Sequence, residues 1–255
     1  MNRGFDGTNG CQRAMNGGRM RGRGRMRWQG VGIVLLAVTA WASPRTNALS
    51  AAQARTGGLQ GIVTTRAKAP RPLRITYDQE VCGDELPNQS ILVDPAGHLA
   101  NVVVTLVGVK ARTPQHEVKV VNEKCAFVPR VQAVGSKATL KTSSKDPILH
   151  TTTVQLADGR QLFNLALPVP NLELAKPLDG SGALRIGCST HQWMRGWLYV
   201  TDDVAVVTGP DGRFALPDVA PGTYQLRVWH EALKGAERSI TIAAGTAATA
   251  DIVMQ

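Results

Sequence analysis

The chain has 255 residues, with 29 Lys and Arg against 19 Asp and Glu, which gives a formal net charge of +10. Eight arginines and one acid fall within residues 1–54, so the other 201 residues hold 21 basic and 18 acidic side chains, a net +3. That surplus is too small for the clustered phosphate-neutralising surface on which nucleic-acid affinity depends. We therefore expect no DNA or RNA partner.

An apolar run at residues 31–42 follows the arginine-rich leader, and small residues follow at 40–42 and 52–54. A basic segment, a short apolar stretch and a small-residue site are typical of a secretory signal peptide. The run of 12 residues is shorter than the roughly 20 that span a bilayer. We predict a signal peptide and leader at residues 1–54, export to the periplasm or another extracytoplasmic compartment, and no stable membrane span after cleavage. An uncleaved N-terminal anchor is the alternative.

Export would remove Cys11 with the leader and leave three cysteines, Cys82, Cys125 and Cys188. In an oxidising compartment two of them should form a disulfide, and the third then needs another role. The cysteine count alone leaves open which two are joined.

Beyond residue 55 the chain alternates short β-branched, apolar segments with turns rich in Gly, Pro and Asp. This pattern predicts strands joined by hairpin connections. No stretch of 15 residues has capped helical periodicity, although residues 231–237 could form a turn or two. The predicted strands are residues 59–65, 99–107, 117–121, 151–156, 183–186, 197–200, 213–216, 223–229 and 239–242.

Regular short strands of this kind favour an all-β fold built from β-sandwiches, and 201 residues suffice for two sandwiches of about 100 residues each. Residues 196–255 form a run of hairpin patterns, whereas the preceding segment holds every mature cysteine and four of the five histidines. We predict a first domain at residues 55–195 and a smaller second domain at 196–255.

A group of potential metal ligands lies in the sequence Cys188-Ser-Thr-His191-Gln-Trp-Met194. A thiolate, an imidazole and a thioether on one tight loop suit copper better than zinc or magnesium. A blue-copper site needs a second imidazole, and His150 supplies one 38 residues earlier. Strand ends in a sandwich can meet at one pole, so the sequence predicts one mononuclear copper site formed by these four residues.

Each of these residues taken singly also has a structural explanation. A lone cysteine is usually a small buried apolar residue, a lone methionine usually belongs to a core, and a lone surface histidine usually has no ligand. The combined spacing is much less probable by accident. The site requires a free Cys188, so a disulfide from Cys188 to Cys82 or Cys125 would abolish it.

Residues 58–194 resemble the cupredoxin-like domain of exported proteins described as methylamine-utilisation-like, with a ligand loop similar to the amicyanin type. The resemblance implies a Greek-key β-sandwich in which His150, Cys188, His191 and Met194 bind copper while Trp193 shields the loop. It also implies a disulfide between Cys82 and Cys125. Further matching stretches are residues 78–83, 92–97, 125–129 and 162–166.

Two positions depart from this pattern. Most cupredoxins have Asn after the first ligand histidine, and its amide joins the two ligand loops; this chain has Thr151 there. A hydroxyl must make that link or the link is lost. The usual Asn-Ser-Asp before the proline is replaced by residues 143–146, Ser-Ser-Lys-Asp. Neither change removes a ligand, but both bear on the potential and rigidity of the site.

Residues 196–255 resemble the carboxypeptidase regulatory-like domain, a transthyretin-like sandwich also grouped with carbohydrate-binding-like folds. The resemblance rests on the turn and strand pattern of residues 208–228 and implies a scaffold or docking module. Residues 61–63 and 99–107 also look like pieces of this sandwich, so the cupredoxin domain could share its edge or be inserted into it. We expect a structural hydrogen bond for His230.

These observations predict an exported copper protein that transfers single electrons between extracytoplasmic redox partners. His191 would be the exposed exit edge, within an apolar rim of Ile148, Leu149 and Trp193. We expect no enzyme, because phosphate-loop, nucleophile-elbow and zinc-protease motifs are missing and the four ligands leave no open position for substrate. The alternatives are copper storage or delivery, and a non-redox envelope scaffold that binds carbohydrate or protein.

Overall fold

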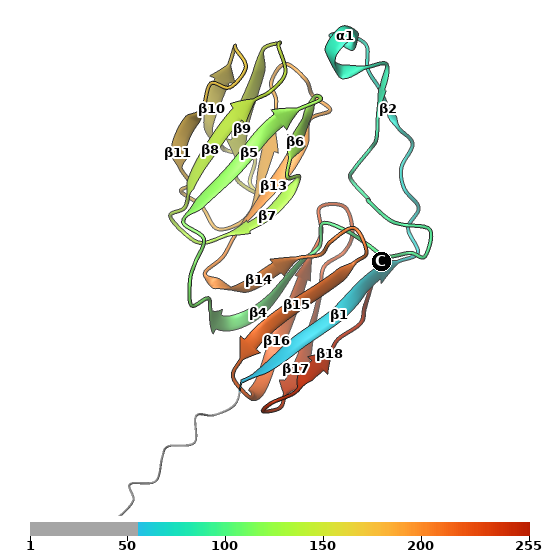
Figure 1. The fold of residues 1–255 in the computed structure, drawn as a ribbon, viewed down its shortest axis with the longest axis vertical. Coiled ribbons are helices and arrows are strands. Elements are labelled where there is room, and N and C mark those ends of the chain that lie inside the picture. Colours follow the sequence, from blue (N-terminus) through green and yellow to red (C-terminus); the bar gives the residue numbers. More distant parts are fainter. Residues whose placement is uncertain (1–55) are drawn as a thin grey trace, which may run out of the picture. The chain divides into compact units, whose positions relative to one another are not determined.

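The computed structural model describes residues 56–255 (Figure 1). Within this range the chain forms strands β1 to β19 and one four-residue helix, α1 (Gln79–Cys82), so the expected all-β fold class is confirmed. The predicted signal peptide and leader lie outside the described residues. No helix within residues 56–255 has the length and hydropathy required for a membrane span.

The first sandwich consists of two sheets that share one apolar core. Val120, Leu140, Ile186 and Leu198 are buried between the two sheets. One sheet has the order β10 (Gln161–Leu167), β9 (His150–Gln155), β12 (Gly182–Gly187), β13 (Arg195–Val200) and β7 (Val131–Val134). The other has the order β11 (Leu174–Pro177), β8 (Thr139–Ser144), β5 (Glu117–Glu123) and β6 (Ala126–Val128).

The second sandwich also has two sheets around its own core, in which Leu59, Leu106, Phe214 and Leu226 are buried. Its first sheet contains β15 (Arg213–Val219), β1 (Gly57–Thr65), β18 (Ala247–Thr249) and β19 (Ile252–Met254), the last of which pairs with β1. Its other sheet has the order β14 (Asp203–Val207), β4 (Val103–Lys110), β16 (Gly222–Trp229) and β17 (Ala236–Ile242).

Strand pairing does not follow the order of the chain. β1 pairs with β15, and β4 pairs with β14 and β16, so both early strands belong to the sandwich that contains the C-terminus. This arrangement matches the expectation that these strands are pieces of the second sandwich. The pairing divides the strands of the predicted 55–195 domain between the two sandwiches, and the domain boundaries themselves remain a prediction.

Buried contacts join the two sandwiches. Val103 of β4, Val131 of β7 and Tyr199 of β13 form a small apolar cluster, against which Trp197 and Trp229 pack. Close by, the guanidinium of Arg130 donates two hydrogen bonds to the carboxylate of Glu231, at 2.7 and 2.9 Å. The side chains of this ion pair are only 11% and 6% exposed.

A short arm precedes the first sandwich and carries the helix. It contains β2 (Leu73–Arg74), α1 and β3 (Glu85–Leu86), with β2 and β3 paired antiparallel. A disulfide between Cys82 and Cys125 attaches the arm to the turn between β5 and β6. Neither these strands nor the helix was predicted from the sequence.

Candidate metal centre

The pairing of β9 with β12 brings the proposed ligands to one end of the first sandwich. His150 is the first residue of β9, and Cys188 directly follows β12. The two strands are antiparallel, with Gly187 paired to Thr153. Because the start of one antiparallel strand lies beside the end of its partner, residues 38 positions apart meet. His191 lies three residues beyond Cys188, on the loop that leads into β13.

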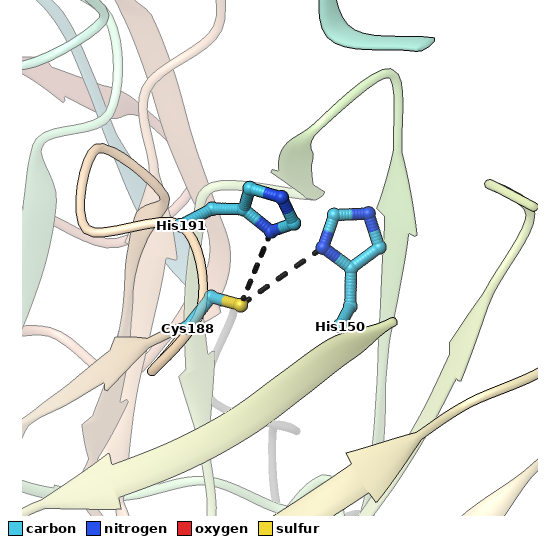
Figure 2. A group of neighbouring side chains, drawn as sticks. All are labelled: His150, Cys188 and His191. Carbon is cyan, nitrogen blue, oxygen red and sulfur yellow. Dashed lines mark hydrogen bonds between the residues drawn. The ribbon is translucent and has the colours of Figure 1, made fainter. Parts of the chain in front are cut away.

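Three of the four predicted ligand residues converge in a buried group (Figure 2). The sulfur of Cys188 lies 3.9 Å from Nδ1 of His150 and 3.6 Å from Nδ1 of His191. The three potential ligand atoms all lie within 4.8 Å of one another. Cys188 is 6% exposed, and both histidines are 0% exposed.

Each of the two imidazoles also contacts a carboxylate on its other side. Nε2 of His150 lies 3.0 Å from Oδ2 of Asp146, and Nε2 of His191 lies 2.9 Å from Oδ2 of Asp78. Carboxylate oxygens accept hydrogen bonds, so Nε2 carries the proton in both rings, and in a neutral imidazole the lone pair of Nδ1 then faces Cys188. Such partners fix the orientation of histidines that bind metals.

Thr151 joins the two ligand segments in place of the expected asparagine. Its backbone N–H donates to the sulfur of Cys188 at 3.3 Å, and its hydroxyl lies 3.7 Å from the same sulfur. The hydroxyl oxygen also accepts a hydrogen bond of 2.7 Å from the backbone N–H of Ser189. The link is therefore made by the hydroxyl and is not lost.

The surroundings of Cys188 favour the thiolate. Burial on its own raises the pKa of the thiol, but the contacts of the sulfur with His150, with the backbone N–H of Thr151 and with His191 outweigh it. Together they lower the pKa from 9.0 to about 6. The thiolate is the form that binds metals.

Met194 lies on the same loop and is 2% exposed. Its backbone N–H donates to the carbonyl of His191 at 3.0 Å, which closes a turn in the loop. This places Met194 within the core of the first sandwich. Its role as the axial ligand remains a prediction.

The expectation that His191 forms an exposed edge is wrong. The Tyr77 ring stacks on the His191 ring, with centroids 5.6 Å apart and an interplanar angle of 18°. The Tyr77 hydroxyl donates a hydrogen bond to the carbonyl of Thr190, and the carboxylate of Asp78 is hydrogen-bonded to Nε2 of His191. The arm therefore covers the imidazole, and Tyr77, which is 42% exposed, provides the outer surface.

The predicted apolar rim is present in part. Trp193 is half-buried. Its ring centroid lies 5.0 Å from that of His191 and 4.9 Å from that of Tyr77. Leu149 is 47% exposed, whereas Ile148 is half-buried against the core. Tyr77, Asp78 and Asp146 were not predicted from the sequence as neighbours of the site. The only signal for Asp78 was its place in a stretch that matched the resembled family.

The disulfide implied by the resemblance is present. Cys82 and Cys125 are joined, and Cys188 is free and buried. Cys125, Asp146 and His150 form a second compact group of potential ligands, but the disulfide removes the sulfur of Cys125 from metal binding. Asp146 instead accepts hydrogen bonds from the backbone N–H groups of Lys124 and Cys125, at 2.8 and 2.9 Å.

The donor set fits copper. One thiolate and two imidazoles, with a thioether on the same loop, match the ligands typical of blue-copper sites. The carboxylates of Asp78 and Asp146 complete the outer contacts that such histidines require.

Comparisons with known proteins found one family-model match and several solved structures of low similarity. A family model described as the carboxypeptidase regulatory-like domain matches residues 199–255. A novel purple cupredoxin from Nitrosopumilus maritimus is 17% identical, with a TM-score of 0.29; the match covers 33% of this chain and 99% of that one. Amicyanin from Paracoccus versutus is 17% identical, with a TM-score of 0.31; the match covers 38% of this chain and 97% of that one. A search of curated proteins found no match. The chain is thus an all-β protein in which a buried group of one cysteine and two histidines precedes a region similar to the carboxypeptidase regulatory-like domain.

Proposed function

We propose that His150, Cys188, His191 and Met194 hold one copper ion and that the protein transfers single electrons between redox partner proteins outside the cytoplasm. The observation that carries this proposal is the buried convergence of the Cys188 sulfur with Nδ1 of both histidines, at 3.9 and 3.6 Å. A bound copper ion would supply a one-electron couple between its cuprous and cupric forms.

The protein's contribution is a fixed ligand geometry. Asp146 and Asp78 orient the two imidazoles, and Thr151 holds the sulfur of Cys188 by its backbone N–H. Ligands held by such contacts rearrange little when the charge at the site changes, which favours fast electron transfer. Burial of the three residues excludes water from the group.

This arrangement favours a carrier over a catalyst. If Met194 completes the set, four protein atoms fill the coordination positions and leave none for a substrate. Tyr77 and Trp193 both pack on His191, and Tyr77 reaches solvent. We propose that partner proteins approach the site over this covered face.

Substitutions of Met194 test whether this residue is the axial copper ligand. Replacement by Gln should lower the reduction potential, because a harder oxygen ligand favours the cupric form, and replacement by Leu should raise it. Opposite shifts identify a ligand and not a packing residue. Met254→Leu is the control, since Met254 is also buried but belongs to the second sandwich.

Voltammetry gives the potentials, and a competing chelator measures copper loss. Reversible one-electron cycling with slow copper loss supports electron transfer. Irreversible cycling with rapid copper loss from the wild-type protein would instead favour delivery.

A further inference from the structure

A second potential binding site lies beside the ligand loop. It is a pocket of about 570 Å³ between the arm, the β5–β6 turn, residues 192–195 and Glu231. Pockets that bind small molecules usually measure about 300–1,000 Å³ and have mainly apolar walls with a few polar groups. The apolar part of this pocket's wall includes Leu73, Leu86, Ala126, Val128 and Trp193.

The buried polar groups at one side of this pocket are already satisfied. Glu231 accepts two hydrogen bonds from Arg130 and one of 2.9 Å from the indole N–H of Trp197. Arg130 also donates to the carbonyl of Arg195 at 2.9 Å. This network fixes the shape of the pocket and leaves Glu231 no need for a cationic ligand.

The remaining charges give the pocket a positive surplus. Its other acid, Glu123, is paired with Lys145 at 3.0 Å, and Lys145 does not line the pocket. Lys124 and Arg195 both line the pocket, and neither forms an ion pair among residues 56–255. An anion is therefore the complementary ligand.

We propose that this pocket binds a small organic anion with a flat apolar body, namely an aromatic carboxylate. The ring system would pack against Trp193 and the apolar wall, and the carboxylate would lie near Lys124 and Arg195. Aromatic pairs gain free energy beyond the burial of their area, and carboxylates form charge-assisted hydrogen bonds with Arg and Lys.

The proposed binding site does not depend on the copper assignment. None of His150, Cys188 or His191 lines the pocket, although Trp193 and Met194 do. The metal-free chain should therefore bind the same ligand. Because Trp193 lies in the wall, ligand binding should change tryptophan fluorescence.

The test uses 2-naphthoate as the probe and neutral 2-naphthamide, which has the same ring system, as its comparison. Calorimetric titration of the full chain should show saturable binding of naphthoate, with the amide at least about tenfold weaker. Lys124→Gln combined with Arg195→Gln should weaken naphthoate binding by about tenfold or more and leave amide binding unchanged.

Lys176→Gln is the matched control, because Lys176 is exposed on β11 and does not line the pocket. This control should bind naphthoate as the wild type does. Three results would overturn the proposal: no saturable naphthoate binding, equal affinity for the acid and the amide, or equal losses in the control and the double variant. The copper-dependent colour would be unaffected by any of them, so failure here is separable from failure of the copper assignment.

Discussion

Asp78 and Asp146 each form a hydrogen bond with one of the two candidate ligand histidines. Asp146 lies four residues before His150, whereas Asp78 reaches His191 across 113 residues. A negative charge beside a ligand imidazole increases its basicity and stabilises the more positive metal state. The two carboxylates should therefore help to set the reduction potential.

Replacing Asp78 with Asn should raise the reduction potential of the copper-loaded protein. The change removes the negative charge near His191 but keeps a side chain of the same size. Copper should therefore remain bound, and the protein should keep its colour. Voltammetry measures the shift. Asp84→Asn, on the same arm and also exposed, should leave the potential unchanged; a potential insensitive to Asp78→Asn would refute this role.

His230 should make the stability of the second sandwich depend on pH. Burial lowers its pKa below the ordinary 6.5, Glu231 opposes this and Arg130 adds to it. Between its folded-state pKa and 6.5 the unfolded chain therefore binds more protons, so this contribution to stability is lost as the pH falls from 6.5 through the lower folded-state pKa. Its Nδ1 accepts a hydrogen bond of 3.2 Å from the backbone of Ala232, as expected for a structural histidine.

His230→Gln should flatten the dependence of unfolding free energy on pH between 7 and 5. The slope lost should be at most about 1.4 kcal/mol per pH unit, the limit for one proton. Denaturant unfolding at several pH values measures this slope. An identical pH profile in the variant would contradict the assignment.

Local spacing made the ligand residues predictable. Cys188 and His191 are separated by one tight turn, so their proximity follows from the sequence between them. The pairing of His191 with Asp78 depends on where the arm lies, which no short-range pattern encodes. For this reason the sequence indicated three residues that the structure brings together, His150, Cys188 and His191, but left His191 exposed in the prediction.

The arm of β2, α1 and β3 is secured by its disulfide, by its contacts with the ligand loop and by Ile75, which is buried in the core of the first sandwich. Two strands of two residues each and a helix of four residues are too short to be stable alone. The Cys82–Cys125 disulfide, which spans 43 residues, should therefore position Tyr77 and Asp78 over His191.

Replacing both Cys82 and Cys125 with Ser should lower the free energy of unfolding by about 2–5 kcal/mol. Hydrogen exchange at the backbone amides of the arm should also become faster than in the wild type, since the arm loses its covalent attachment. Exchange in β9 should increase less. Denaturant unfolding and hydrogen exchange measure the two effects. Unchanged exchange in the arm would show that side-chain contacts alone hold it in place.

Strands with clear alternation were predictable, and several short ones were not. Residues 223–229 and 183–186 alternate or carry β-branched side chains, and they form most of β16 and part of β12. β7, with only four residues, pairs in parallel with β13. A parallel pair needs a distant partner, so the four residues of β7 did not suffice to predict it.

The Arg130–Glu231 ion pair connects the first sandwich to the end of β16 in the second. Glu231→Gln should leave a buried guanidinium without its counter-charge and destabilise the protein by about 3–5 kcal/mol. Thermal and denaturant unfolding measure this loss. Glu237→Gln is the control, because its pair with Arg227 is exposed and exposed pairs contribute little. Equal effects of the two substitutions would contradict a linking role for Arg130 and Glu231.

The connectivity of the two sandwiches was predicted only as one of two alternatives. Residues 61–63 and 99–107 resembled pieces of the C-terminal sandwich, and the pairing of β1 and β4 confirms that part of the prediction. Periodicity shows which residues form strands but not which distant strand each one joins. The choice between a shared edge and an insertion therefore needed the structure.

The most direct test of the copper assignment is the visible spectrum of the copper-loaded full chain beside that of Cys188→Ser. A thiolate bound to cupric copper gives intense visible absorption, so the wild-type protein should be strongly coloured and its zinc-loaded form colourless. Cys188→Ser should lose the colour while remaining folded. A wild-type protein that binds no copper, or binds it without colour, would contradict the account, as would a Cys188→Ser variant with the same spectrum.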